Sequence, residues 1–186
     1  MKWNFADRNQ YVWDKQVNRA RVTMGENTVL LDLNEITGKA YKNGTEVSGE
    51  EAQKLISAAW SNWCNDSFWL LAPYKLFDPG TKRTLVPLEG QGMGLLVTYE
   101  SGGVTPGDSY LWILNKDNTP SRWRMWVSNI PMGGALASWE GWKTLYNGAR
   151  VSTEHDLSIF QLVLSDMDAG ESLSDIGLDE NLFAAM

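Results

Sequence analysis

The sequence predicts an α+β protein whose sheets are mainly antiparallel. Residues 11–42 alternate apolar and polar side chains in short segments joined by short links, which is typical of strands. Residues 49–63 instead repeat apolar side chains at helical spacing, and strand-like segments return after residue 80. Because short links allow only antiparallel pairing and the strands are grouped around a helix, the pattern favours α+β over a parallel α/β fold.

The opening segment is predicted to be an antiparallel meander. We expect its strands over residues 11–14, 17–24, 28–34 and 38–42. The sequence Gly25-Glu26-Asn27 indicates one turn, and Asn43-Gly44 is a strong tight-turn signal.

A helix is predicted over residues 49–63. Ser48 is a suitable N-cap, with Glu51 three residues later as in a capping box. One apolar face follows the i, i+3, i+4 spacing and consists of Leu55, Ile56, Ala59, Trp60 and Trp63. Asn62, Asn65 and Asp66 predict the exit from this helix, with Asp66 or Ser67 capping a new short turn.

The next segment, Phe68, Trp69, Leu70 and Leu71, is apolar at every position. Pro73 disfavours helix at the residue before it and ends the run. Two interpretations stay open: these side chains are core, or the insert at about residues 48–77 forms a lid over an apolar cavity.

Strand signals resume after the turn Asp78-Pro79-Gly80. We expect strands over residues 84–88, 94–100, 108–115, 121–129, 149–152 and 157–167, a strand or strand plus turn over 136–146, and a turn over 89–92. The clearest hairpin joins residues 108–115 to 121–129, with Trp112 on one strand and Trp123 and Met125 sharing a face of the other. The glycine-rich loop at 101–108 lacks the ending of a phosphate loop, so a sheet corner is the better interpretation. The acidic tail carries Leu182 and Phe183 as a tether.

Length and charge limit the classes of function. The chain has 186 residues, which predicts a single domain over residues 1–186. A net charge of −7 argues against nucleic acid and anionic lipid surfaces as partners. No apolar run is long enough to span a membrane, and no signal peptide is visible. Because Met1 is followed directly by a strand-like polar segment, a mature form whose export signal has been removed is one interpretation.

The hairpin YLWILNKDNTPSRWRMW and the segment FWLLAPYKLFDPG carry a family resemblance, together with residues 148–152 and the Leu182-Phe183 tail. Over residues 11–183 the chain resembles the lipoprotein-carrier superfamily, the LolA-like fold, and an uncharacterised branch of bacterial envelope proteins within it. The resemblance implies an incomplete antiparallel barrel, a half-barrel wrapped around one or two helices. This chain differs from that family in its abundance of Trp.

What the resemblance implies is a binding protein of the cell envelope, periplasmic or associated with the outer membrane. Anchoring there would come from an N-terminal lipid signal that this chain lacks. The expected ligand is a lipid or acyl chain held in the concavity without catalysis. The expected binding residues are Trp60, Trp63, Phe68, Trp69, Leu70, Leu71, Trp112, Trp123 and Met125.

Catalytic signals are weak. His155 stands alone between Glu154 and Asp156 and is expected at the surface, so neither a zinc site nor a serine triad is predicted. Cys64 is expected to be buried and unreactive. Arg122 and Arg124 are expected on a solvated face. We therefore expect no metal, no cofactor and no catalytic residue.

An alternative class uses the same residues differently. Trp side chains stack on sugars as well as they pack against lipids, and Asp66, Asp78 and Asp108 fall at segment ends that could meet at a barrel mouth. A carbohydrate-active or carbohydrate-binding protein would combine these two features. The structural interpretation of the same carboxylates is a cap, a turn residue and a loop end.

Overall fold

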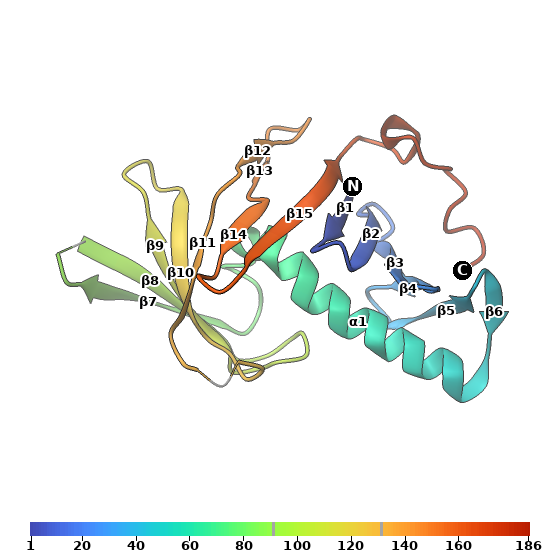
Figure 1. Ribbon diagram of the computed structural model, residues 1–186, viewed down its shortest axis with the longest axis horizontal. Helices are drawn as coiled ribbons and strands as arrows, with labels where there is room; N and C mark the ends of the chain where they lie inside the picture. Colours follow the sequence, from blue (N-terminus) through green and yellow to red (C-terminus); the bar gives the residue numbers. More distant parts are fainter. Residues whose placement is uncertain (91, 131) are drawn as a thin grey trace. The chain divides into compact units, whose positions relative to one another are not determined.

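The computed structural model describes residues 1–90, 92–130 and 132–186 and confirms the α+β class, with one α-helix and mostly antiparallel strands in that part of the chain (Figure 1). The helices are α1 (Gly49–Leu71) and two 3₁₀ turns, η1 (Ala72–Tyr74) and η2 (Ser174–Ile176). The strands are β1 (Lys2–Phe5), β2 (Asn9–Asp14), β3 (Arg19–Met24), β4 (Asn27–Asp32), β5 (Thr37–Lys42), β6 (Thr45–Val47), β7 (Thr81–Leu88), β8 (Gly92–Tyr99), β9 (Ser109–Leu114), β10 (Pro120–Trp126), β11 (Ala135–Ser138), β12 (Lys143–Thr144), β13 (Arg150–Val151), β14 (Glu154–Asp156) and β15 (Gln161–Asp168).

The chain forms two compact units. Unit 1 comprises Met1–Asp66, Thr144–Arg150 and Val163–Met186, and unit 2 comprises Ser67–Lys143 and Val151–Leu162. Unit 2 is thus inserted into the sequence of unit 1, and each unit is built on a sheet. The expectation of a single domain stays a prediction.

Unit 1 contains the predicted meander, in the strand order β15-β1-β2-β3-β4-β5-β6. Every link from β1 to β6 is a short antiparallel connection, and β1 also pairs with β15. The predicted tight turn is confirmed, because Asn43 and Gly44 both have positive φ (49° and 77°), as a primed hairpin turn requires. Two further strands, β1 and β6, were not predicted because each is too short for a clear period.

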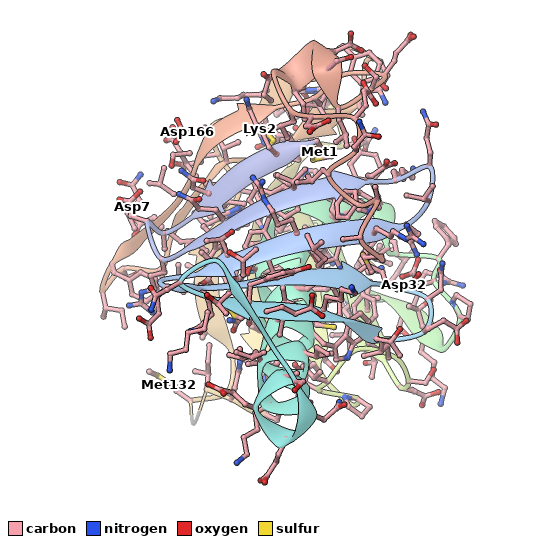
Figure 2. The ribbon with its side chains drawn as sticks, turned by 90° about the vertical axis from the view of Figure 1, so that its right-hand side faces the viewer. Met1, Lys2, Asp7, Asp32, Met132 and Asp166 are labelled. Carbon is pink, nitrogen blue, oxygen red and sulfur yellow. The ribbon has the colours of Figure 1, made fainter. Side chains whose placement is uncertain are left out.

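Both faces of this sheet are covered (Figure 2). On one face, Trp63 of α1 packs against Trp3, Tyr11 and Trp13. On the other, Val12 and Leu30 form a core cluster with Leu173, Ile176 and Phe183 of the C-terminal segment. Phe183 is 5% exposed, so the predicted tether is confirmed for this residue.

Unit 2 is built on a five-stranded antiparallel sheet in the order β11-β10-β9-β8-β7. The predicted hairpin of β9 and β10 is confirmed, with Trp112 directly opposite Trp123. β14 lies beside the first residues of β15, through a turn in which Leu157 N–H donates to Phe160 O. β7 and β8 pair as expected, although the turn predicted over 89–92 includes Gln91, which lies outside the described residues. In the part of the chain that the structure describes, neither large sheet closes into a barrel.

One edge of this sheet is protected by a proline. Glu100 N–H donates to Gly80 O, so the even-numbered residues of β7 direct their backbone groups at β8 and the odd-numbered ones face away from it. Pro87 is one of the odd-numbered residues, so its backbone faces the unpaired edge of the sheet. Because proline has no N–H, this edge has one hydrogen-bond donor fewer there. Proline at such a position discourages pairing with another strand.

Candidate functional site

The predicted binding residues fall in both units. Trp60 and Trp63 belong to unit 1, whereas Phe68, Trp69, Leu70, Leu71, Trp112, Trp123 and Met125 belong to unit 2. The unit 2 set is brought together around the sheet, and the candidate site is therefore described within unit 2.

The predicted helix exit at residues 62–66 is wrong. α1 continues without a break to Leu71, so Phe68–Leu71 is its last turn and not a separate flap. Asp66 is a helix residue and not a cap, because its carboxylate is engaged by β2: Asn9 Nδ2 and Tyr11 Oη donate to it at 2.8 and 2.5 Å. A side chain bound elsewhere does not compete for the local backbone, which is how such residues normally end a helix. Pro73 then lies in the 3₁₀ turn that follows.

The face of the unit 2 sheet that carries the predicted aromatic residues is called the inner face here. Its residues Val97, Tyr110, Trp112, Trp123, Met125 and Ala137 are all buried. Phe68 stacks on Trp123 with ring centroids 5.8 Å apart, and Trp69 meets the same ring edge-on at 5.1 Å. The centre of the inner face is thus filled by the protein's own side chains, as the core interpretation expected.

His155 is buried and not at the surface, which corrects the prediction. It lies between Trp139 and Trp69, with ring centroids 4.7 and 5.1 Å away. Nδ1 lies 2.9 Å from Ser138 O, and since a carbonyl only accepts, Nδ1 carries the proton of the neutral ring. Burial lowers the pKa of His155 to about 4. The backbone carbonyls of Ser138 and Trp69 have a smaller effect in the opposite direction, raising the pKa. A neutral, enclosed imidazole of this kind is a core residue.

The inner face is open at its β7–β8 end. Leu85 pairs across with Leu95, Pro87 pairs with Met93, and Leu95 in turn lies opposite the buried Trp112. Leu85 is 65% exposed and Met93 is 53% exposed. Leu85, Pro87, Met93 and Leu95 are called the open strip here. It continues the apolar inner face into solvent, and an exposed apolar patch of this kind is typical of a binding surface.

A cation and an aromatic ring lie beside the open strip. Arg83 precedes Leu85 on the same face of β7, and its guanidinium lies 4.5 Å from the centre of the Phe77 ring, a cation–π contact. The Arg83 Nη1 also donates to Leu76 O at 2.8 Å. Phe77 itself is 79% exposed. The open strip therefore has an apolar floor with a positive charge at one side.

The sequence reasoning missed the open strip, although a signal was present. Alternation along β7 and β8 puts Leu85, Leu95 and Trp112 on one face once the register is known. The register depends on the turn at residues 89–92, which sequence alone fixed too loosely.

The predicted carboxylates do not form a group in one unit. Asp66 belongs to unit 1, whereas Asp78 and Asp108 belong to unit 2. Asp78 pairs with Lys75 at 2.6 Å, and Asp108 accepts the N–H of Ser128 at 2.9 Å, so both have structural roles. No group of three or more His, Cys, Asp or Glu side chains suited to a metal ion occurs among the described residues.

Asp66 is a buried carboxylate of unit 1. Burial raises its pKa, while hydrogen bonds from Tyr11, Asn65 and Asn9 act in the opposite direction. Burial and the neighbouring Asp66 charge likewise raise the pKa of Tyr11. With three donors on one carboxylate, this cluster fastens α1 to β2 and leaves Asp66 little freedom to act on a ligand.

A scan against protein-family models and a search of curated proteins each found no match. No described helix, α1 included, is long and apolar enough to cross a membrane. The resemblance to the lipoprotein-carrier superfamily stays a prediction.

Proposed function

We propose that the chain binds an apolar ligand, a lipid or an acyl chain, along the open strip of unit 2. The observation that carries the proposal is the exposure of Leu85 and Met93 on the face whose centre is the buried Trp112 and Trp123 cluster. A ligand on this strip would extend a preformed apolar core instead of requiring a new one.

The energetics favour an acyl chain. Each buried methylene contributes about 0.8 kcal/mol, so eight of them supply ~6 kcal/mol before the costs of association. Leu85 and Met93 would add the burial of their own exposed area. Arg83 provides a positive charge for the carboxylate of a fatty acid or the phosphate of a lipid.

The fold-level part of the proposal rests on the resemblance. We infer a carrier-type half-barrel located in the cell envelope, and the open five-stranded sheet of unit 2 is compatible with it. In such a protein the apolar ligand occupies the concave face, and catalysis is not required.

The test is a titration with a fluorescent fatty acid, cis-parinaric acid, followed by energy transfer from Trp. We expect saturable binding near one ligand per chain. Replacing Leu85 and Met93 together with Ser should weaken binding at least ~10-fold, since two apolar contacts are lost. The unfolding midpoint should change little because both side chains are exposed.

A matched control removes two apolar side chains elsewhere on unit 2. Ile159 and Phe160 are 88% and 53% exposed, and their double replacement with Ser should leave binding unchanged. Equal weakening by both double variants would indicate nonspecific apolar adsorption and contradict the proposal. Absence of binding by the parent protein would do the same.

The carbohydrate alternative stays a prediction. Trp3, Trp112, Trp123 and Trp139 are each at most 2% exposed and offer no stacking platform, whereas Trp126 is 43% exposed. A co-purified glycan seen by native mass spectrometry would favour it over the lipid proposal.

A further inference from the structure

Unit 1 contains a cavity of about 160 Å³ that no part of the lipid proposal uses. It lies where the β2–β3 turn, the segment after β12 and the C-terminal segment meet. Its lining residues are Met1, Trp13, Asp14, Lys15, Gln16, Leu145, Tyr146, Asn147, Ala169, Gly170, Glu171, Ser172, Leu173 and Glu180. All of them belong to unit 1.

The volume of the cavity limits its ligand. An engineered protein cavity of about 150 Å³ holds benzene, so this one suits a ligand of roughly six to eight non-hydrogen atoms. Tyr146 in the lining is 57% exposed, so the cavity is open to solvent and its volume describes the part of a ligand that it can surround.

The charge of the lining favours a cation. Asp14, Glu171 and Glu180 bring three carboxylates, against the ammonium groups of Lys15 and the Met1 terminus. The Met1 ammonium donates to Trp13 O at 3.0 Å and also interacts electrostatically with Asp14, so part of the Asp14 charge is already balanced. The whole chain carries −7, which adds to the attraction.

Two of these carboxylates are fixed in place. Asp14 Oδ1 accepts the N–H of Gln16 at 2.9 Å within its turn, and Glu180 Oε1 accepts the N–H of Ser174 at 2.8 Å. A preorganised charge loses little freedom when a ligand binds. Among the described residues these carboxylates do not form a group suited to a metal ion.

Aromatic rings complete the lining. Trp13 is held by its edge contact with Trp63, at 5.6 Å, and by Nε1 donating to Asn18 Oδ1 at 3.3 Å. The Lys15 ammonium already lies 5.9 Å from the Trp13 ring centre, at the outer limit of a cation–π contact. This ring therefore attracts a cation, and a ligand held more closely could displace Lys15. Tyr146, which is 57% exposed, brings a second ring.

We propose that this cavity, with Trp13 in its lining, binds a small organic cation, a quaternary ammonium compound of about the size of choline. The Trp13 and Tyr146 rings would contact the methyl groups, and Asp14 with Glu180 would balance the charge. This is the combination of aromatic faces and carboxylates by which proteins recognise quaternary ammonium groups.

The test uses choline chloride and two matched comparisons on the intact chain. The Trp13 indole N–H resonance, assigned with Trp13→Phe, is followed by NMR while choline is added at constant ionic strength. We expect saturable shifts with a Kd in the millimolar range or below. The neutral isostere 3,3-dimethylbutanol should bind about 10-fold more weakly, since it has the same shape without the charge.

The matched variants are Asp14→Asn and Asp32→Asn. Asp32 Oδ1 accepts N–H groups of residues 34 and 35 in an equivalent turn, so both changes remove one charge and keep the turn acceptor. Asp32→Asn also removes the ion pair with Arg19, whose Nε lies 3.7 Å from Asp32 Oδ2. Asp32 is not among the cavity residues and lies well apart from Met1 (Figure 2). Asp14→Asn should weaken choline about fivefold, and Asp32→Asn should not.

Three results would overturn the proposal. Choline could cause no saturable shift, or the neutral isostere could bind equally well, which would make the cavity merely apolar. Equal effects of Asp14→Asn and Asp32→Asn would show that only the overall charge of the chain attracts choline.

Discussion

Acidification should destabilise the protein through His155. The ring is 0% exposed, and burial lowers its pKa to about 4, whereas an unfolded histidine titrates near 6.5. Between these two pH values His155 is protonated in the unfolded chain and neutral in the folded chain. The contribution of the neutral His155 to the free energy of unfolding is therefore complete above pH 6.5 and is lost as the pH falls. The two pKa values give a loss of about 2 kcal/mol at pH 5 and about 3 kcal/mol below pH 4.

The assay compares urea unfolding of the parent and His155→Asn at pH 7 and pH 5, monitored by Trp fluorescence. The Asn amide can still donate to Ser138 O but cannot gain a proton in this range. The variant should be less stable than the parent at pH 7. From pH 7 to pH 5, the free energy of unfolding of the variant should fall by about 2 kcal/mol less than that of the parent. The raised pKa of Asp66 has the opposite effect, because it makes acidification stabilise the folded chain. Asp66 and the other titrating groups are present in both proteins, so their effects cancel in the comparison. Equal losses in parent and variant would refute the reasoning.

Two further substitutions test the packing of unit 1. Tyr11→Phe removes a hydrogen bond to the buried Asp66 carboxylate, so the free energy of unfolding in urea should fall by about 1.5–3 kcal/mol. The control Tyr41→Phe should lower it clearly less. Similar losses in the two variants would contradict the role given to Asp66. Gly38→Ala would place a Cβ 2.0 Å from the backbone oxygen of Leu30, so the thermal midpoint should fall by several degrees; an unchanged midpoint would show that β4 and β5 can separate freely.

The sequence was sufficient where the signals are local. Alternation and turn residues predicted the meander and the β9–β10 hairpin, because period and turn chemistry act over a few residues. The end of α1 was predicted wrongly because Asp66 is bound by β2, more than fifty residues earlier in the chain. No local pattern contains that information.

The candidate site was predicted only in part. Trp112, Trp123 and Met125 share one face as expected, but whether that face is filled or open depends on what packs against it. His155 was misplaced because its neighbours are acidic. In β14, however, side chains alternate, so Glu154 and Asp156 face the opposite way from the buried ring.

The pairing of β1 with β15 governs how the chain can acquire its structure during synthesis. Lys2 lies opposite Asp168, so β1 cannot pair with β15 until about 160 further residues have been synthesised. Closing so long a loop costs about 2 kcal/mol more than closing one of 20 residues. Most of unit 2 is a continuous stretch, Ser67–Lys143, which can form its contacts before the last strand emerges. We expect unit 1 to be the late-folding part, with β1 and the sheet face over Val12 and Leu30 exposed to chaperones until the C-terminal segment arrives.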